Sequence, residues 1–331
     1  MMKVLLLGGT GYIGSRLAML LAQTGWATPV VTSRRSGIDT TNLESMSRAL
    51  EGMDAVVNCV SGSADSIAQG ARVLVQAAHK AGHPRIVHLS TMSVYGALEG
   101  EVTEASPRDP SIGWYARAKC EAEDIIADYE GGAVMLRPGC VWGAGSDLWV
   151  GRIGRLLRAR RLGDLGAAGD GWSNLVAVDD VCQAAAASLR IETTPGLPRV
   201  FNLAAPDSPR WNDYFVDLAL AIRATPVKRL SARRMKLDAK LLGPPLKLAE
   251  IAMRKAKLPT RDLPDPIPPG LLGVFERHLH LRGDLAAREL ALEWTPYERV
   301  LRESAAWFDI AFASGALPVA SATWPSFPNP R

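Results

Sequence analysis

The chain has 331 residues, of which 47% are hydrophobic and 22% are charged, and its formal net charge is +4. This composition is typical of a soluble globular protein with one large domain or two unequal ones, and so small a net charge argues against a nucleic-acid-binding surface. No apolar stretch has the length of a membrane span, and the run Val4–Leu7 is too short for a signal peptide, so we expect a cytoplasmic protein. The four cysteines have no metal-ligand spacing, and we expect reduced thiols.

The first residues predict a dinucleotide-binding loop. An apolar run of strand length, Lys3–Leu7, leads into Gly8-Gly9-Thr10-Gly11-Tyr12-Ile13-Gly14, and a stretch of helical period follows. Glycines permit a tight turn and let the backbone approach a pyrophosphate, while the helix N-terminus offers N–H groups to the phosphates. The glycine pattern alone is weak, because such loops also cap strands, but its position between strand and helix favours nucleotide binding.

The end of the next predicted strand, Thr28–Thr32, bears on the choice of cofactor. It is followed by Ser33, Arg34 and Arg35. An acidic residue at this position would bind a ribose 2′-hydroxyl, whereas arginine accommodates a 2′-phosphate. We therefore expect NADP(H) rather than NAD(H), and the alternative is that the arginines only solvate a surface loop.

Apolar runs and helical periods then alternate along the chain. We expect strands at 55–60, 85–89, 133–136, 175–178 and 200–203, with helices at 43–50, 67–81 and 114–129. This alternation predicts an α/β fold with a Rossmann-type, doubly wound parallel sheet. Residues 1–170, with 174–204 returning to them, would form the NAD(P)-binding domain. Residues 205–331 would form most of a smaller substrate-binding region, with helices at 214–223, 235–257, 288–292 and 300–308 and a disordered tail from about 314.

Tyr115 and Lys119 are the strongest candidates for catalysis. Their spacing puts them on one face of a helix, one turn apart. An ammonium group beside a phenol lowers the pKa of the phenol, which makes it a usable acid or base near neutral pH. Thr91 follows a predicted parallel strand and could hydrogen-bond the same substrate oxygen.

Together these stretches resemble the extended short-chain dehydrogenases/reductases, the NAD(P)-dependent epimerase/dehydratase family. The resemblance covers nearly the whole chain and is weakest between residues 225 and 280. The matching stretches are the Gly8–Gly14 loop, Ser90–Gly96, Tyr115 with Lys119, Arg137–Gly143, Val178–Val181, Phe201–Leu203, Leu292–Pro296 and Ser304–Phe308.

The resemblance implies a role for each matching residue. Tyr115 would donate or accept the proton, Lys119 would bind the nicotinamide ribose and tune Tyr115, and Thr91 would hold the substrate oxygen. The cofactor-binding residues would be Gly8, Gly11, Tyr12, Ile13 and Gly14 at the pyrophosphate, Asp39 at the adenine, Val60 and Ser61 behind the cofactor, and Pro138 and Val141 against the nicotinamide. Family members commonly pair through two helices each, which predicts a homodimer formed by residues 67–81 and 114–129.

Departures from the family pattern reduce the number of reactions that the chain is expected to catalyse. Met92 and Ser93 replace the Asp-Glu pair of sugar-nucleotide dehydratases, which argues against dehydration. Sugar-nucleotide epimerases often use an asparagine and an Arg-Asp-Tyr/Phe stretch for their nucleotide-diphosphate sugars. Here Cys140 replaces the asparagine, and Ser173–Leu175 replaces the stretch. We therefore favour an NADP(H)-dependent oxidoreductase that interconverts a ketone and a secondary alcohol on a small-molecule substrate.

Two alternatives remain at this point. One is a sugar-nucleotide epimerase with tightly bound NAD(P). The other is a non-catalytic cofactor sensor, which would have no need to keep Thr91, Tyr115 and Lys119 together.

The arginine-rich stretch and the tryptophans each have a functional and a structural interpretation. Five arginines between Arg152 and Arg161 could hold an anionic substrate group or form a solvated face. Trp114, Trp142, Trp149 and Trp172 could line an apolar pocket or pack in the core. His278 and His280 lack a third ligand nearby, so we predict no metal site.

Overall fold

The computed structural model describes residues 1–33, 37–256 and 264–314, so Arg34, Arg35 and the predicted disordered tail lie outside the described residues. The chain divides into two compact units. The first consists of Met1–Gly139, Val176–Pro206 and Leu281–Trp294, and the second of Cys140–Leu175, Asp207–His280 and Thr295–Arg331. These bounds differ from those predicted, because residues 140–170 belong to the second unit and residues 281–294 belong to the first.

The first unit is built on a six-stranded parallel sheet with the strand order β2-β1-β3-β4-β6-β9. Four consecutive residues of β3 and nearly all of β4 and β6 are buried, as expected for strands covered on both faces. The predicted doubly wound α/β fold is thereby confirmed. The strands are β1 (Met2–Leu7), β2 (Ala27–Thr32), β3 (Ala55–Asn58), β4 (Arg85–Leu89), β6 (Ala133–Pro138) and β9 (Arg199–Leu203).

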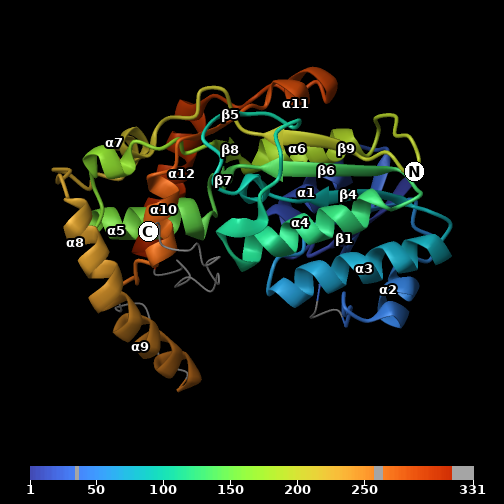
Figure 1. The fold of residues 1–331 in the computed structure, drawn as a ribbon, viewed down its shortest axis with the longest axis horizontal. Coiled ribbons are helices and arrows are strands. Elements are labelled where there is room, and N and C mark those ends of the chain that lie inside the picture. Colours follow the sequence, from blue (N-terminus) through green and yellow to red (C-terminus); the bar gives the residue numbers. More distant parts are fainter. Residues whose placement is uncertain (34–36, 257–263, 315–331) are drawn as a thin grey trace. The chain divides into compact units, whose positions relative to one another are not determined.

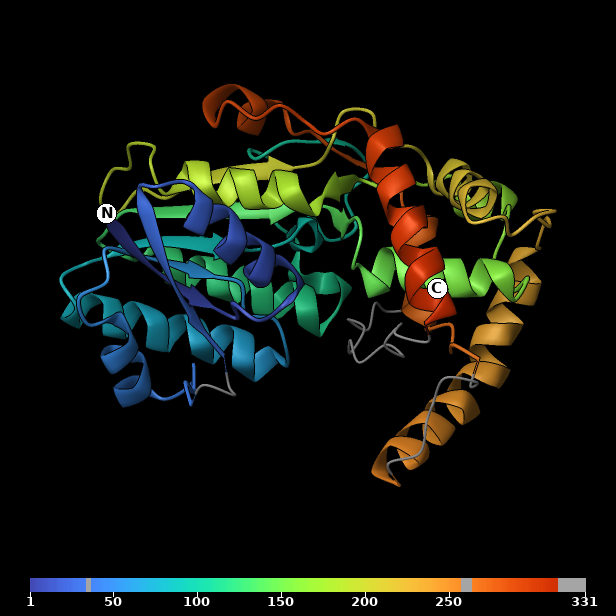
Figure 2. The ribbon, with the colours of Figure 1, turned by 180° about the vertical axis from the view of Figure 1, so that it is seen from behind.

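Helices cover both faces of this sheet. Figure 1 shows α3 (Ala64–Lys80) and α4 (Trp114–Ala127) side by side on one face, with α2 (Leu43–Leu50) next to α3. Figure 2, seen from behind, shows α1 (Tyr12–Gln23) and α6 (Val178–Ser188) on the other face. Side chains cap two of these helices, because Asn42 accepts the Ser45 N–H at the start of α2 and Ser63 accepts the Ser66 N–H at the start of α3.

The strand register brings the carboxyl ends of the strands to one edge of the sheet. Leu7 at the end of β1 pairs with Thr32 of β2 and with Asn58 of β3, and Asn58 pairs in turn with His88 of β4. The loops that follow β1, β3 and β4 therefore begin side by side. In open parallel sheets this edge is where ligands bind.

Shorter elements complete the first unit and its junctions. The last helix of the unit, α11 (Asp284–Glu289), ends before Ala291, whose φ of 51° is incompatible with a helix, so the helix expected at 288–292 is wrong in its bounds. The other elements are β5 (Gly100–Val102), 3₁₀ turns at Met92–Tyr95 and Pro110–Ile112, β8 (Leu175–Ala177) and β10 (Leu279–Leu281).

The second unit is mainly helical and has an aromatic core. The ring of Trp211 lies 5.8 Å from that of Phe215 and 4.9 Å from that of Phe275, while Trp142 packs edge-on against Tyr214. Its elements are β7 (Cys140–Trp142), a π-helical turn at Asp147–Gly151, α5 (Arg152–Arg158), a 3₁₀ turn at Gly166–Gly169, α7 (Trp211–Ala221), α8 (Ala232–Leu237), a second π-helical turn at Asp238–Leu242, α9 (Gly243–Lys255), α10 (Pro269–Phe275) and α12 (Tyr297–Ala313).

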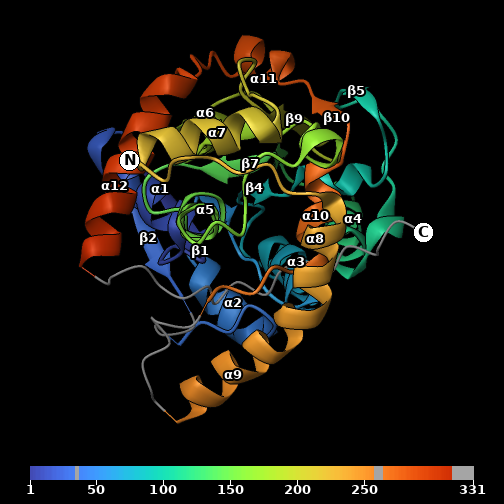
Figure 3. The same ribbon diagram turned by 90° about the vertical axis from the view of Figure 1, so that its left-hand side faces the viewer.

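The long helix expected at 235–257 is interrupted. Figure 3 shows α8 and α9 following one another, and the π-helical turn at Asp238–Leu242 separates them. Pro244 and Pro245 follow this turn after Gly243. Proline has no N–H for a preceding carbonyl and is best tolerated in the first turn of a helix, which is where both lie in α9. Across the described ranges, no helix combines the length and the apolar character needed to cross a bilayer.

Candidate active site

The glycine loop has the shape that a dinucleotide requires. Gly8 follows β1 with a φ of +73°, and the Gly11 N–H donates to the Gly8 carbonyl at 2.9 Å. A Cβ on Gly14 would lie only 2.4 Å from the Gly8 oxygen, so glycine is needed for the start of α1 to pack against the loop. The N-cap residue of α1 is Gly11, which has no side chain that could accept a hydrogen bond from the first N–H groups of the helix. The loop therefore fits a pyrophosphate at a helix N-terminus.

The loops after β2 and β3 contain Asp39, expected at the adenine, and Val60 and Ser61, expected behind the cofactor. Asp39 accepts hydrogen bonds from the Thr41 N–H at 2.9 Å and the Thr41 hydroxyl at 2.7 Å, which lower the pKa of Asp39. The Val60 N–H donates to Asn58 Oδ1 at 3.1 Å, while Ser61 is exposed. The geometry thus gives Asp39 a local structural role, and its contact with adenine stays a prediction.

Thr91 and Tyr115 lie close together at the carboxyl edge of the sheet. Thr91 follows β4, and its Oγ1 accepts the Ser93 N–H at 3.2 Å. Burial raises the pKa of the Tyr115 phenol to about 12, and a hydrogen bond with the Thr91 side chain acts in the opposite direction. The Trp114 ring packs edge-on against the Tyr115 ring, with 5.7 Å between centroids. Tyr115 is therefore a neutral phenol at neutral pH and holds a proton that it can donate.

Lys119 is buried one helical turn after Tyr115. Lys119 is only 2% exposed, and its Nζ donates to the Leu89 carbonyl at 2.7 Å. Burial lowers the pKa of Lys119 to about 8, while the charge of Glu123 acts to raise it. The prediction that Lys119 lowers the pKa of Tyr115 is wrong for the chain without a cofactor. Desolvation of the phenol dominates, and the charge of Lys119 acts on Cys59 and His88 instead.

Asn58 and His88 form a polar pair in the sheet that we did not single out from the sequence. Asn58 Nδ2 and His88 Nδ1 lie 3.2 Å apart, and both residues are buried. Burial and the nearby Lys119 hold the pKa of His88 well below its usual value, so the imidazole is neutral. A polar residue within an otherwise apolar parallel strand was the available signal for both positions.

A buried network underlies the site and uses residues of three family-like motifs. Arg137 on β6 donates to both carboxylate oxygens of Glu123, at 2.9 and 2.6 Å, and to the Tyr95 hydroxyl at 2.8 Å. Tyr95 in turn donates to Asn202 Oδ1 at 2.7 Å. Glu123 lies one turn after Lys119 on α4. The network therefore ties α4 to β6, β9 and the turn after β4, which fixes the helix that contains Tyr115 and Lys119.

Most of the predicted cofactor residues belong to the first unit. Gly8 to Gly14 and Val60 follow neighbouring strands, and Pro138 is buried at the end of β6, in register with Leu203. Val141 belongs to the second unit. Arg34 and Arg35 fall outside the described residues, whereas Ser33 directly follows β2.

The positions where the chain departs from the epimerase pattern are buried in the second unit. Asn174 Nδ2 donates to the Leu279 carbonyl at 2.8 Å, and the Ser173 hydroxyl lies 2.9 Å from that of Ser208. The Cys140 N–H donates to the Asn174 carbonyl at 2.9 Å. The side chains of Ser173 and Asn174 thus take part in local hydrogen bonding, and that of Cys140 is buried.

The arginine group and the tryptophans have structural roles. Arg155 pairs with Asp147 and Asp265, Arg158 with Asp309, and Arg161 with Asp238. These carboxylates neutralise three of the five arginines within the second unit, while Arg152 is buried and Arg160 is exposed. Among the tryptophans, Trp142 and Trp149 pack in the core, Trp172 stacks on His280 at 4.2 Å, and Trp114 contacts Tyr115.

Comparison with known proteins assigns the chain to a family. Residues 4–204 match the profile of the NAD dependent epimerase/dehydratase family, which is more than half of the chain. The chain belongs to the NAD-dependent epimerase/dehydratase family. The resemblance inferred from the motifs is confirmed.

Individual relatives of the epimerase/dehydratase family are distant. Protein YeeZ of Escherichia coli K12 is 26% identical over 248 residues, covering 68% of this chain and 86% of that protein. N-acetyl-alpha-D-glucosaminyl-diphospho-ditrans,octacis-undecaprenol 4-epimerase of Escherichia coli O157:H7 is 26% identical over 167 residues, covering 43% of this chain and 49% of the enzyme.

Solved structures agree on the fold. A double mutant of the dTDP-glucose 4,6-dehydratase DesIV from Streptomyces venezuelae, with NAD bound, superposes with a TM-score of 0.70 at 19% identity, covering 96% of this chain and 100% of that chain. UDP-N-acetylglucosamine 4-epimerase from Bacillus cereus has a TM-score of 0.69 at 17% identity, covering 93% and 100%.

The buried network makes a prediction about stability for this family member. Glu123→Gln removes the charge that pairs with the buried Arg137, and breaking a buried ion pair costs about 3 kcal/mol or more. Glu121→Gln is the matched control, because it makes the same change on the same helix to a carboxylate that, like its partner Arg72, is about half exposed. We expect the control to change the free energy of unfolding by less than about 1 kcal/mol.

Urea denaturation of the two variants measures the difference. Equal losses of stability would contradict the assignment of Glu123 and Arg137 as the pair that holds α4 on the sheet.

Proposed function

We propose that the protein is a sugar-nucleotide epimerase that keeps NAD(P) bound and returns the abstracted hydride to the same substrate. The observation that carries this proposal is the neutral Tyr115 phenol, hydrogen-bonded with Thr91 beside the edge where the glycine loop begins, one turn from Lys119. A proton donor of this kind suits the interconversion of a hydroxyl and a carbonyl group. Membership of the epimerase/dehydratase family supports it.

The side chains divide the chemistry among them. NAD(P), when bound, supplies the acceptor and donor of hydride. To serve the oxidation step, Tyr115 would act as the phenolate, which the positive charge of an oxidised nicotinamide, when bound, would favour. The phenolate would take up the hydroxyl proton as the substrate carbon is oxidised, and the phenol so formed would return that proton to the carbonyl oxygen as the carbon is reduced. Thr91 hydrogen-bonds the same oxygen and fixes its direction. The N–H groups at the start of α1 hold the pyrophosphate.

The comparisons support epimerisation over net oxidation or reduction, which we favoured from the sequence. A curated relative is a 4-epimerase, and structural neighbours include UDP-N-acetylglucosamine 4-epimerase and UDP-glucuronic acid 4-epimerase, both from Bacillus cereus. Dehydratases are also among these neighbours. Met92 and Ser93 argue against that reaction here, because neither has a carboxylate to remove or donate a proton.

A net ketone/alcohol oxidoreductase is the second candidate. It is favoured by Cys140, Ser173 and Asn174, which replace residues that epimerases often use for a nucleotide diphosphate. Their side chains are buried, and those of Ser173 and Asn174 hydrogen-bond within the second unit.

The two candidates differ in what happens to the cofactor. Incubation with UDP-glucose, UDP-N-acetylglucosamine or UDP-glucuronic acid, followed by analysis of the sugar, measures epimerisation. Near-ultraviolet absorbance measures reduced nicotinamide. We expect an inverted sugar without net formation of reduced cofactor. Reduced cofactor formed in step with product would instead identify the oxidoreductase. If none of the three sugar nucleotides is converted, the sugar-nucleotide assignment is contradicted.

We also propose a preference for NADP(H), supported by Arg34 and Arg35 after β2 and by the lack of an acidic residue there. Neighbouring structures contain NAD, so the preference needs its own test. Arg34→Ala should weaken binding of NADP by about tenfold or more through loss of a charged hydrogen bond, and should leave NAD unaffected.

Arg48→Ala is the control, because it removes the same charge from an exposed position on α2. Calorimetric titration with both dinucleotides provides the affinities. Equal affinity of the unmodified protein for NAD and NADP, or equal weakening of both by Arg34→Ala, would refute the preference.

A further inference from the structure

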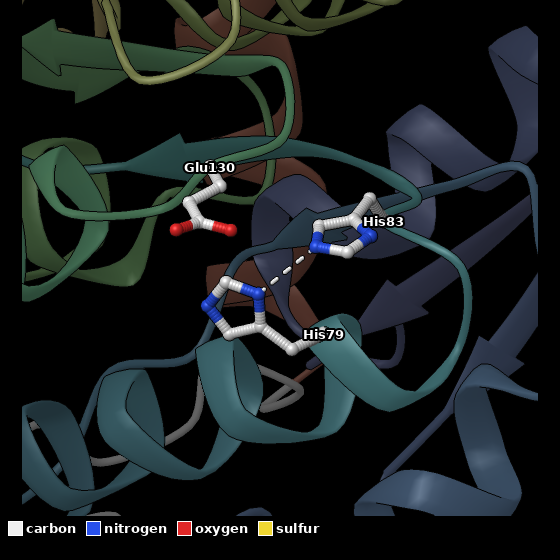
Figure 4. A group of neighbouring side chains, drawn as sticks. All are labelled: His79, His83 and Glu130. Carbon is white, nitrogen blue, oxygen red and sulfur yellow. Dashed lines mark hydrogen bonds between the residues drawn. The ribbon is translucent and has the colours of Figure 1, made fainter.

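Three potential metal ligands meet at the edge of the sheet opposite the candidate active site. His79 lies in the last turn of α3, His83 in the turn before β4, and Glu130 just after α4. Figure 4 shows the three side chains converging. One ligand atom from each lies within 4.8 Å of the others. His79 Nδ1 and His83 Nε2 are 3.0 Å apart. All three residues are exposed, so an ion could reach them from solvent.

The two imidazoles are held in place by a buried tyrosine. Tyr129 stacks on His83 with 6.0 Å between ring centroids and meets His79 edge-on at 5.4 Å. Tyr129 is only 1% exposed, and its hydroxyl donates to the Pro84 carbonyl at 2.7 Å. The backbone of His83 is fixed as well, since its N–H donates to the Ala78 carbonyl at 3.0 Å. The ring positions are therefore determined by packing and backbone hydrogen bonds rather than by exposed side-chain rotamers alone.

The donor set suits a divalent transition-metal ion. Two imidazole nitrogens and a carboxylate oxygen are common ligands of Zn²⁺, with water in the fourth position. Zn–N bonds of 2.0–2.1 Å in a tetrahedral site separate two nitrogens by about 3.3 Å, close to the spacing seen here. We propose that His79, His83 and Glu130 form a binding site for a divalent transition-metal ion such as Zn²⁺.

The position of the site indicates a stabilising role. The ion would join the end of α3, the entry to β4 and the segment after α4. Thr91 follows the other end of β4, beyond Leu89, so the ion would be remote from the proposed proton transfer. Metal binding should therefore stabilise the first unit and leave dinucleotide binding unchanged.

The contact between the two imidazoles must change when an ion binds. It is a hydrogen bond, which needs a proton on one of the facing nitrogens. Metal binding needs the lone pair of both nitrogens, so that proton must leave the facing position.

Titration of tag-free, chelator-treated protein with ZnCl₂ tests the proposal, with the visible spectrum of bound Co²⁺ as a second readout. We expect one ion per chain and a raised melting temperature. His79→Ala and His83→Ala should each weaken Zn²⁺ binding at least about tenfold, and Glu130→Gln should weaken it severalfold. His278→Ala is the matched control, because it removes another exposed histidine, and should bind as the unmodified protein does.

Several results would overturn this proposal. They are the absence of Zn²⁺ binding at submillimolar concentration, unchanged affinity in His79→Ala or His83→Ala, and unchanged affinity in Glu130→Gln, which would remove the carboxylate from the site. Dinucleotide titration checks that each variant is folded, so a loss of Zn²⁺ binding with normal dinucleotide affinity is specific to the ligands.

Discussion

The buried ammonium of Lys119 is the constraint on which the candidate active site depends. Placing this group out of water is costly unless it is hydrogen-bonded, and the Leu89 carbonyl at the end of β4 accepts that bond. The bond ties the first turns of α4 to the strand end that Thr91 follows. Glu123, one turn further along α4, is held by Arg137 of β6. These interactions position Tyr115 beside Thr91.

The same burial sets the protonation states of the site. It raises the pKa of Tyr115 to about 12 and lowers that of Lys119 to about 8. The phenol therefore holds its proton at neutral pH, which is the form that protonates the carbonyl oxygen in the reductive half of the proposed reaction. Burial also raises the pKa of Cys59 to about 12 and so keeps this side chain a thiol. This cysteine beside the glycine loop is therefore not a nucleophile. Tyr115 is left as the proton carrier that the proposed hydride chemistry uses.

Local patterns in the sequence predicted the parts of the fold that local physics determines. The apolar strands, the helical periods and the glycine loop each depend on near neighbours, and the helix at 43–50 was predicted with its observed bounds. Interactions between distant residues were not accessible. Arg155 pairs with Asp265, 110 positions away, so its charge could not be recognised as neutralised. The pKa of Tyr115 was predicted in the wrong direction, because burial depends on the packing of the whole unit. Glu130 meets His79 and His83 only because α3 and α4 run side by side.

Replacing Tyr115 by phenylalanine tests the central claim most directly. The variant loses only the hydroxyl, so dinucleotide affinity should stay within about twofold, while turnover of a converted sugar nucleotide should fall by about 100-fold or more. Tyr129→Phe, which removes a hydroxyl at the opposite edge of the sheet, should retain turnover. Turnover by Tyr115→Phe within a few-fold of the unmodified enzyme would contradict the account, because the proton would then have to come from another group.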